Sequence, residues 1–108
     1  MANKANITLL QLNCHKSSAV MLNLRQNFTH KSKIFLLQEP HLHKDKVTGL
    51  SGMNVCSFGQ HPRAAIACSN DLNVWPEPKY SDPDMSTVIL SKGPTKICLL
   101  YTSDAADE

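Results

Sequence analysis

Residues 33–38 read Lys-Ile-Phe-Leu-Leu-Gln, a short and continuous apolar run between polar ends. A run of this kind is typical of a strand that is covered on both faces, as the strands of parallel sheets are. Upstream, residues 7–13 read Ile-Thr-Leu-Leu-Gln-Leu-Asn, which alternates and is rich in residues that favour strands. We predict a second strand there, with one side largely buried.

The segment between these two strands has the pattern of a helix spanning roughly Ser18–Phe28. A serine at its start can cap it, and Val20, Leu24 and Phe28 fall at i, i+4 and i+8 on one apolar stripe. Strand, helix and strand within about 32 residues form a βαβ-like unit, which favours an α/β protein over an all-β one. We therefore expect the two strands to be neighbours in one sheet.

Residues 39–52 are polar, and we expect them to be irregular. After this segment the sequence pattern changes to short strands separated by turns. Short strands are predicted at residues 54–58, 64–68, 72–75 and 86–90, and another strand starts at Thr95. Stretches rich in Gly, Pro, Asn and Asp separate them and predict turns or loops. One βαβ unit followed by a run of hairpins predicts a mixed sheet.

The composition is that of a globular protein, with 42% hydrophobic and 19% charged residues. The longest apolar runs have four or five residues, whereas a membrane-spanning helix needs roughly 18–20. The first residues show neither the apolar core nor the cleavage pattern of a signal peptide. We therefore expect an intracellular protein with no membrane segment.

The four cysteines and the net charge give weaker indications. The cysteines are Cys14, Cys56, Cys68 and Cys98. None forms a C-x-x-C pair, so we expect buried, reduced core residues, and no spacing supports the alternative of a zinc site with His41 or His43. Three of the nine acidic residues lie in the last five positions, leaving six against eleven basic ones. This balance leans mildly toward a polyanionic partner.

Two polar residues stand where the two predicted strands of the βαβ unit end. Asn13 ends the first strand and Glu39 follows the second. Groups at the carboxyl ends of strands line the binding crevice of α/β sheets. A carboxylate opposite a neutral amide suits Mg²⁺, which takes oxygen ligands and keeps several waters. The alternative is that Glu39 is a solvated loop residue.

The sequence motifs around these two residues resemble those of a known family. Residues 9–14 (LLQLNC) and 34–40 (IFLLQEP) are similar to the first two motifs of the endonuclease/exonuclease/phosphatase family. Residues 46–50 (KVTGL), 62–66 (PRAAI) and 84–88 (DMSTV) look like its retrotransposon (non-LTR) endonuclease branch. The resemblance runs from about Ile7 to Ile97.

The resemblance implies an α/β fold, a partial four-layer α/β sandwich of the DNase I-like type with mixed sheets. Glu39 matches the metal-binding glutamate that holds Mg²⁺ or Mn²⁺, and Asn13 matches the active-site asparagine. Where cellular repair members often carry an acidic residue, this chain has His15, and the retrotransposon branch varies at that position. Arg63 is a candidate for binding phosphate; the alternative is an exposed arginine at a strand start.

The resemblance also implies that residues 1–97 are the N-terminal portion of the family's domain. The catalytic tyrosine, the Asp-x-Asn pair and the terminal Asp and His belong to its later half. Residues 98–108 resemble, residue for residue, the translation of a transposase-type sequencing adaptor, so we expect a non-native tail and give Tyr101 no role. The alternative is a strand with an acidic end.

The function that follows is that of a fragment of a metal-dependent DNA endonuclease, which nicks target DNA for retrotransposition. We expect DNA as partner, action in the nucleus and, in the full-length protein, a reverse transcriptase domain on the same chain. With most catalytic groups missing, we expect the fragment to be inactive. The alternatives are a non-catalytic remnant of a decayed element, or another phosphodiesterase or phosphatase of the same superfamily.

Overall fold

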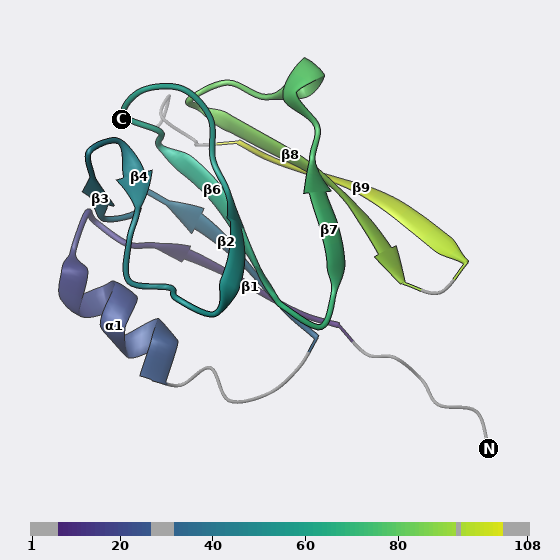
Figure 1. Ribbon diagram of the computed structural model, residues 1–108. Helices are drawn as coiled ribbons and strands as arrows, with labels where there is room; N and C mark the ends of the chain where they lie inside the picture. The colour runs from purple at the N-terminus through teal and green to yellow at the C-terminus, as the bar shows by residue number, and fades with distance from the viewer. Residues whose placement is uncertain (1–6, 27–31, 93, 103–108) are drawn as a thin grey trace.

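The protein is a mixed α/β structure that consists mostly of strands. A computed structural model describes residues 7–26, 32–92 and 94–102. Within these residues the chain forms three β-sheets, one α-helix and one short 3-10 helix (Figure 1). No helix in this described part has the length and apolarity to cross a membrane.

The predicted βαβ unit is confirmed. Strand β1 (Thr8–Asn13) pairs in parallel with β2 (Lys33–Gln38), and helix α1 (Ser18–Gln26) connects them. The helix starts where expected, because the Val20 N–H donates to the Ser17 hydroxyl at 3.3 Å and so satisfies one free amide of the first turn. Phe28, where we expected the helix to end, lies outside the described residues.

Two antiparallel strands complete this first sheet and make it mixed, as predicted. Strand β6 (Ala64–Ser69) lies between β2 and β5 (Met53–Cys56), giving the order β1-β2-β6-β5. All six residues of β6 are buried. This central position, with layers on both faces, explains why the sequence there is a run of small and apolar residues.

The segment at residues 39–52, which we expected to be irregular, contains a short hairpin of β3 (Leu42–His43) and β4 (Lys46–Val47). The turn residues Lys44 and Asp45 both have positive φ, 53° and 65°. Two left-handed residues in succession are what a tight two-residue hairpin turn requires. The prediction was wrong here because neither residue is the Gly or Asn that usually marks such a turn.

The remaining strands form a separate antiparallel sheet with the order β7-β8-β9. It comprises β7 (Asn73–Pro76), β8 (Met85–Lys92) and β9 (Thr95–Thr102), with the 3-10 helix η1 (Pro78–Tyr80) after β7. Strand β9 starts at Thr95 as expected and pairs with β8 over its full length. Residues 98–102 therefore extend a strand, and the expectation of a non-native tail at 98–108 stays a prediction.

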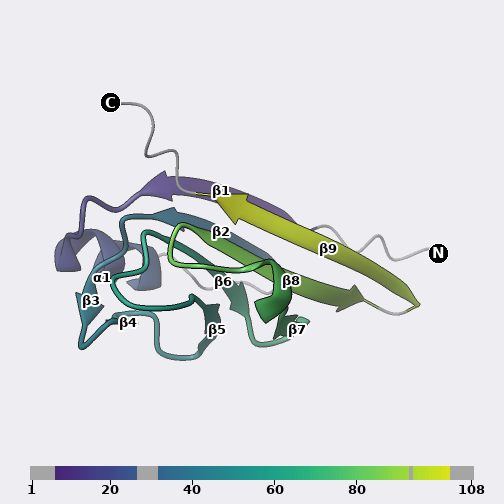
Figure 2. The same ribbon diagram turned by 90° about the horizontal axis from the view of Figure 1, so that it is seen from above.

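Three layers are stacked in this arrangement (Figures 1 and 2). On one face of the four-stranded sheet, Met21 and Leu24 of α1 pack in a core cluster with Phe35 and Leu37. On the other face, the three-stranded sheet contributes to a second cluster, which comprises Ile34, Ala64, Ile66, Cys68, Leu72, Val88, Leu90 and Tyr101. Alternate residues of β2 enter the two clusters, so the prediction of a strand covered on both faces is confirmed.

The expected buried side of β1 is wrong. Leu9 is 55% exposed and Leu10 is 42% exposed, and only Leu12 packs partly against the helix cluster. The cause is position: β1 is an edge strand, and a hollow between it and α1 is lined by Leu10, Leu24 and Phe35 among others. The helix thus packs over β2 and leaves the first part of β1, up to Gln11, exposed.

The cysteines only partly follow the prediction. All four are free thiols, and Cys14 and Cys68 are buried. Cys56 is half-buried, whereas Cys98 is exposed, which corrects the expectation of a buried residue. Neighbouring residues of β9 point to opposite faces, and Tyr101 and Leu99 take the inner face, so Cys98 lies on the outer one. Burial raises the pKa of the Cys14 thiol to about 11 and that of Cys68 to about 12.

Candidate active site

The structure brings the backbones of Asn13 and Glu39 together at one edge of the four-stranded sheet. Asn13 pairs with Gln38 in the parallel register of β1 and β2, and Glu39 is the next residue. Because the strands are parallel, both carboxyl ends lie at this edge. Two further backbone hydrogen bonds fasten the loops there: Cys14 N–H to Gln38 O and Lys16 N–H to Glu39 O, each at 2.7 Å.

The side chain of Asn13 shapes the loop that follows β1. Its Oδ1 accepts a hydrogen bond from the His15 N–H at 2.9 Å, which closes a local turn. His15 and Lys16 both adopt left-handed backbone, with φ of 50° and 55°. A carbonyl oxygen has two lone pairs, so Oδ1 keeps the capacity for a second interaction.

Glu39 has an unusual backbone and a free carboxylate. Its φ is 51°, in the left-handed region, and its N–H donates to the Arg63 carbonyl at 2.9 Å. Within the described residues the half-buried side chain makes no hydrogen bond or ion pair. Left-handed non-glycine residues carry local strain that is often found at functional sites. The carboxylate is thus available to a ligand.

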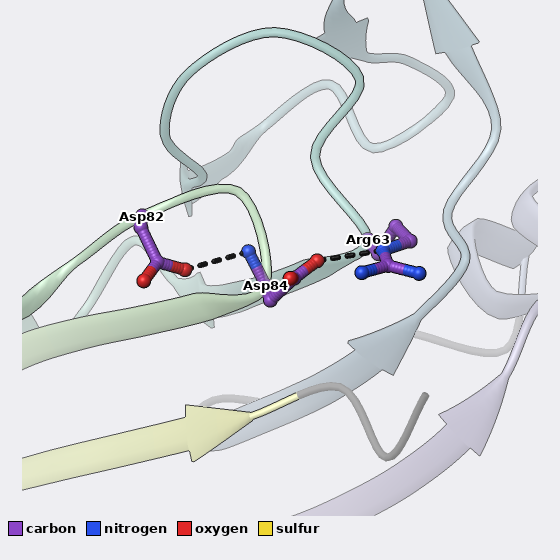
Figure 3. A network of polar contacts seen from close by, with 3 residues as sticks. All are labelled: Arg63, Asp82 and Asp84. Atoms are coloured by element: carbon purple, nitrogen blue, oxygen red, sulfur yellow. Dashed lines mark hydrogen bonds and ion pairs between the residues drawn. The ribbon is translucent and has the colours of Figure 1, made fainter. Parts of the chain in front are cut away.

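Arg63 lies at the same edge, immediately before β6, which runs antiparallel to β2. Its Nε lies 2.6 Å from Asp84 Oδ1, and the Asp84 N–H is in turn held by Asp82 Oδ1 at 2.8 Å (Figure 3). The Arg63 N–H also donates to the Pro83 carbonyl at 2.7 Å. The guanidinium is therefore anchored on one side by the segment that precedes β8.

The pairing of Arg63 with Asp84 favours the charged form of both side chains. The hydrogen bond that Arg63 donates to Asp84, and then the charge of Asp84, raise the pKa of Arg63, with a smaller contribution from the charge of Glu39. The same hydrogen bond lowers the pKa of Asp84.

Sequence reasoning missed the partnership of Arg63 with Asp84, although it singled out both segments. The two residues are 21 positions apart, and each directly precedes a strand, β6 and β8. Those strands belong to different sheets that pack face to face. The available signal was that an arginine and an aspartate each stand just before a predicted strand. Such residues can meet when the two strands start at the same end of two packed sheets.

Metal binding at this edge is chemically compatible with the residues present. In the described part of the chain, no group of three or more His, Cys, Asp or Glu side chains is placed to hold a metal ion. Glu39 and Asn13 offer one carboxylate and one amide oxygen. This donor set fits Mg²⁺ or Mn²⁺, which are bound through one or two protein oxygens and several waters, and does not fit a zinc site.

The two histidines after β2 do not form a ligand pair. His41 Nδ1 lies 2.9 Å from the Thr48 hydroxyl, which anchors it to the far side of the β3–β4 hairpin. His43 is exposed within β3. Tyr101, which the sequence left without a role, is buried between the two sheets.

Comparison with known proteins supports the fold. No family model and no curated protein matches the sequence. Among solved structures, the chain is similar to the endonuclease domain of TRAS1, a telomere-specific non-LTR retrotransposon, with a TM-score of 0.67 and 23% sequence identity. The match covers 95% of this chain and 47% of the other. This chain thus spans about half the length of that domain and shares the fold of the part that it matches.

Proposed function

We propose that this chain is the N-terminal portion of a metal-dependent DNA endonuclease domain of the non-LTR retrotransposon type. The observation that carries the proposal is the meeting of Asn13 and Glu39 at one edge of the sheet, with a Glu39 carboxylate that makes no hydrogen bond or ion pair among the described residues. The similarity in fold to a retrotransposon endonuclease domain supports it. The family motifs around both residues point the same way.

In this proposal the side chains of Asn13 and Glu39 converge on one crevice and hold a hydrated Mg²⁺ or Mn²⁺ between them. A bound cation of this kind polarises a phosphoryl oxygen and stabilises the leaving oxyanion. Asn13 orients the metal site and the scissile phosphate, and Arg63 presents its terminal nitrogens to a phosphate oxygen. Nothing in the chain matches the groups that activate the attacking water, so we infer that it does not cleave DNA by itself.

The proposal includes the complete four-layer sandwich as the fold of the whole domain. The helix, the four-stranded sheet and the three-stranded sheet supply three layers. A fourth layer would cover the outer face of the three-stranded sheet, where Trp75, Ile89 and Cys98 are cross-strand neighbours. Trp75 is 41% exposed, and Leu100 on the same face is 51% exposed. Apolar surface of this kind marks a face that another layer covers.

The proposed activity also suggests an accompanying domain and a cellular compartment. Nicking a target strand supplies a primer end, so we infer a reverse transcriptase domain on the same protein and action on DNA in the nucleus.

The test is to recover the longer reading frame and to assay the protein that it encodes for nicking of supercoiled plasmid. Nicking that needs Mg²⁺ or Mn²⁺, that Glu39→Gln abolishes and that Glu77→Gln leaves intact supports the proposal. Glu77 is the matched control because it is a half-buried glutamate like Glu39 and lies between β7 and η1. A complete domain that nicks equally well with Glu39→Gln, or without metal, contradicts it.

A further inference from the structure

A second feature of the same edge is a pocket of about 310 Å³ whose polar lining is entirely basic. Its side chains come from three loops: Lys16 after β1, His41 after β2, and His61 and Arg63 before β6. Two prolines and a leucine complete the wall. We call the four polar residues and the space that they line the basic pocket.

The backbone fixes the three loops against one another. The Lys16 N–H donates to the Glu39 carbonyl, and the Glu39 N–H donates to the Arg63 carbonyl, at 2.7 and 2.9 Å. Lys16, Glu39 and His61 all have positive φ, between 51° and 55°. Strained backbone that is tied down on both sides indicates a defined shape rather than a chance meeting of surface loops. It also places the basic pocket directly beside Glu39.

The two histidines are each held by one ring nitrogen. His41 Nδ1 contacts the Thr48 hydroxyl at 2.9 Å, and His61 Nδ1 contacts Asp45 Oδ1 at 3.1 Å. Among the described residues, the Nε2 atom of each ring has no partner. A contact at Nδ1 holds each ring in one orientation, and whether Nε2 donates or accepts depends on the protonation of the ring.

The other two residues of the basic pocket, Arg63 and Lys16, also have side-chain nitrogens that are available to a ligand. Arg63 is bound at Nε by Asp84, and its terminal nitrogens have no partner among the described residues. Lys16 contributes an exposed side chain that likewise makes no hydrogen bond or ion pair there. No carboxylate lines the pocket, and the two acids that pair with its residues, Asp45 and Asp84, are not among its lining residues. The pocket therefore presents the N–H donors and the positive charge of Lys16 and Arg63.

We propose that the basic pocket binds a backbone phosphate of the DNA strand, next to the phosphate that is cleaved. This inference rests on the proposed function, because it takes the ligand to be the nuclease's own substrate. A guanidinium fork with free terminal nitrogens matches phosphate oxygens, and a lysine adds a point charge. Contacts to a flanking phosphate fix the strand's position without reading its sequence.

The test is binding of a fluorescein-labelled DNA duplex to the 108-residue chain, measured by anisotropy in EDTA over a series of salt concentrations. The pocket variants are Lys16→Ala, Arg63→Ala and the double variant, and Arg25→Ala on α1 is the control with the same loss of charge. We expect each pocket variant to bind about fivefold to tenfold more weakly near 0.1 M salt, and the slope of log K against log salt to fall by about 0.9 per residue. Arg25→Ala should stay within about twofold of the parent.

Lys16→Ala is the variant that is not expected to disturb folding, because the Lys16 side chain is exposed and makes no hydrogen bond or ion pair among the described residues. Weaker DNA binding by this variant therefore reports on the pocket. Pocket variants that bind like Arg25→Ala overturn the proposal. Failure of the proposed function is read separately, from Mn²⁺ binding to the parent chain and to Glu39→Gln. Loss of DNA binding in the pocket variants without Glu39-dependent Mn²⁺ binding supports the pocket and contradicts the nuclease. Glu39-dependent Mn²⁺ binding with unchanged DNA binding contradicts the pocket alone.

Discussion

The N–H of Glu39 donates to the carbonyl of Arg63 at 2.9 Å, and this bond joins the end of β2 to the start of β6. It puts the carboxylate that we propose as the metal ligand beside the guanidinium that we propose for phosphate. The two side chains carry opposite charge, yet Arg63 pairs with Asp84 and Glu39 makes no ion pair among the described residues. The separation leaves each group available to its own ligand.

The pairing of Asp84 with Arg63 predicts a pH dependence. The folded protein holds the pKa of Asp84 below its ordinary 3.8, so its contribution to stability is present above that pH and is lost as pH falls below it. Thermal unfolding of the parent and of Arg63→Ala, compared from pH 7 down to pH 2.5, should show a small difference that disappears at the acid end. NMR titration should find the Asp84 pKa raised toward its ordinary value in the variant. An unchanged Asp84 pKa would show that the ion pair does not form.

Two glycines provide a matched test of how the loop before β5 packs on the helix. Both have left-handed φ, 91° at Gly49 and 89° at Gly52. A Cβ at Gly49 would lie 2.9 Å from the Cβ of Met21, whereas one at Gly52 would meet nothing within 4 Å. Gly52→Ala should destabilise by about 1 kcal/mol through backbone strain, and Gly49→Ala by about 1–3 kcal/mol more through overpacking. Equal losses in urea unfolding would argue against the contact between this loop and α1.

The uncovered sheet surfaces predict self-association. Leu9 on the β1 edge is 55% exposed, and Leu100 on the outer face of β9 is 51% exposed. Exposed apolar strands at sheet edges favour aggregation, and charge on them opposes it. Leu9→Lys and Leu100→Lys should raise the monomer fraction in analytical ultracentrifugation. Leu22→Lys, at a similarly exposed site on α1, is the control, and an equal gain from it would point to net charge instead.

The chain by itself should not nick DNA. The metal, the activated water and the charge stabilisation of phosphodiester hydrolysis act as a unit, and Asn13 and Glu39 supply only the first of these. Supercoiled plasmid incubated with Mg²⁺ or Mn²⁺ should therefore show the same background with the parent chain and with Glu39→Ala. Metal-dependent nicking that the substitution removes would contradict this and would restore Tyr101 as a candidate.

The sequence predicted the elements that local pattern controls. The apolar run at residues 33–38 and the helical stripe before it determined the parallel pair of β1 and β2, and that pair puts Asn13 and Glu39 at one edge. Exposure of Leu9 and Leu10 was not predictable in this way, because it depends on which neighbours an edge strand has. The partners of Arg63 and His61 come from segments 21 and 16 residues away and depend on the packing of loops.

Mn²⁺ titration of the ¹⁵N-labelled chain, followed by NMR, is the most direct test of the central claim. A bound Mn²⁺ broadens the signals of nearby amides, so the account predicts that Cys14, His15 and Glu39 lose intensity first. Glu39→Gln should remove this pattern, and Glu77→Gln should preserve it. Early loss at Asp71, Asp82 or Asp84 instead, or the same pattern in Glu39→Gln, would contradict a metal site at the ends of β1 and β2.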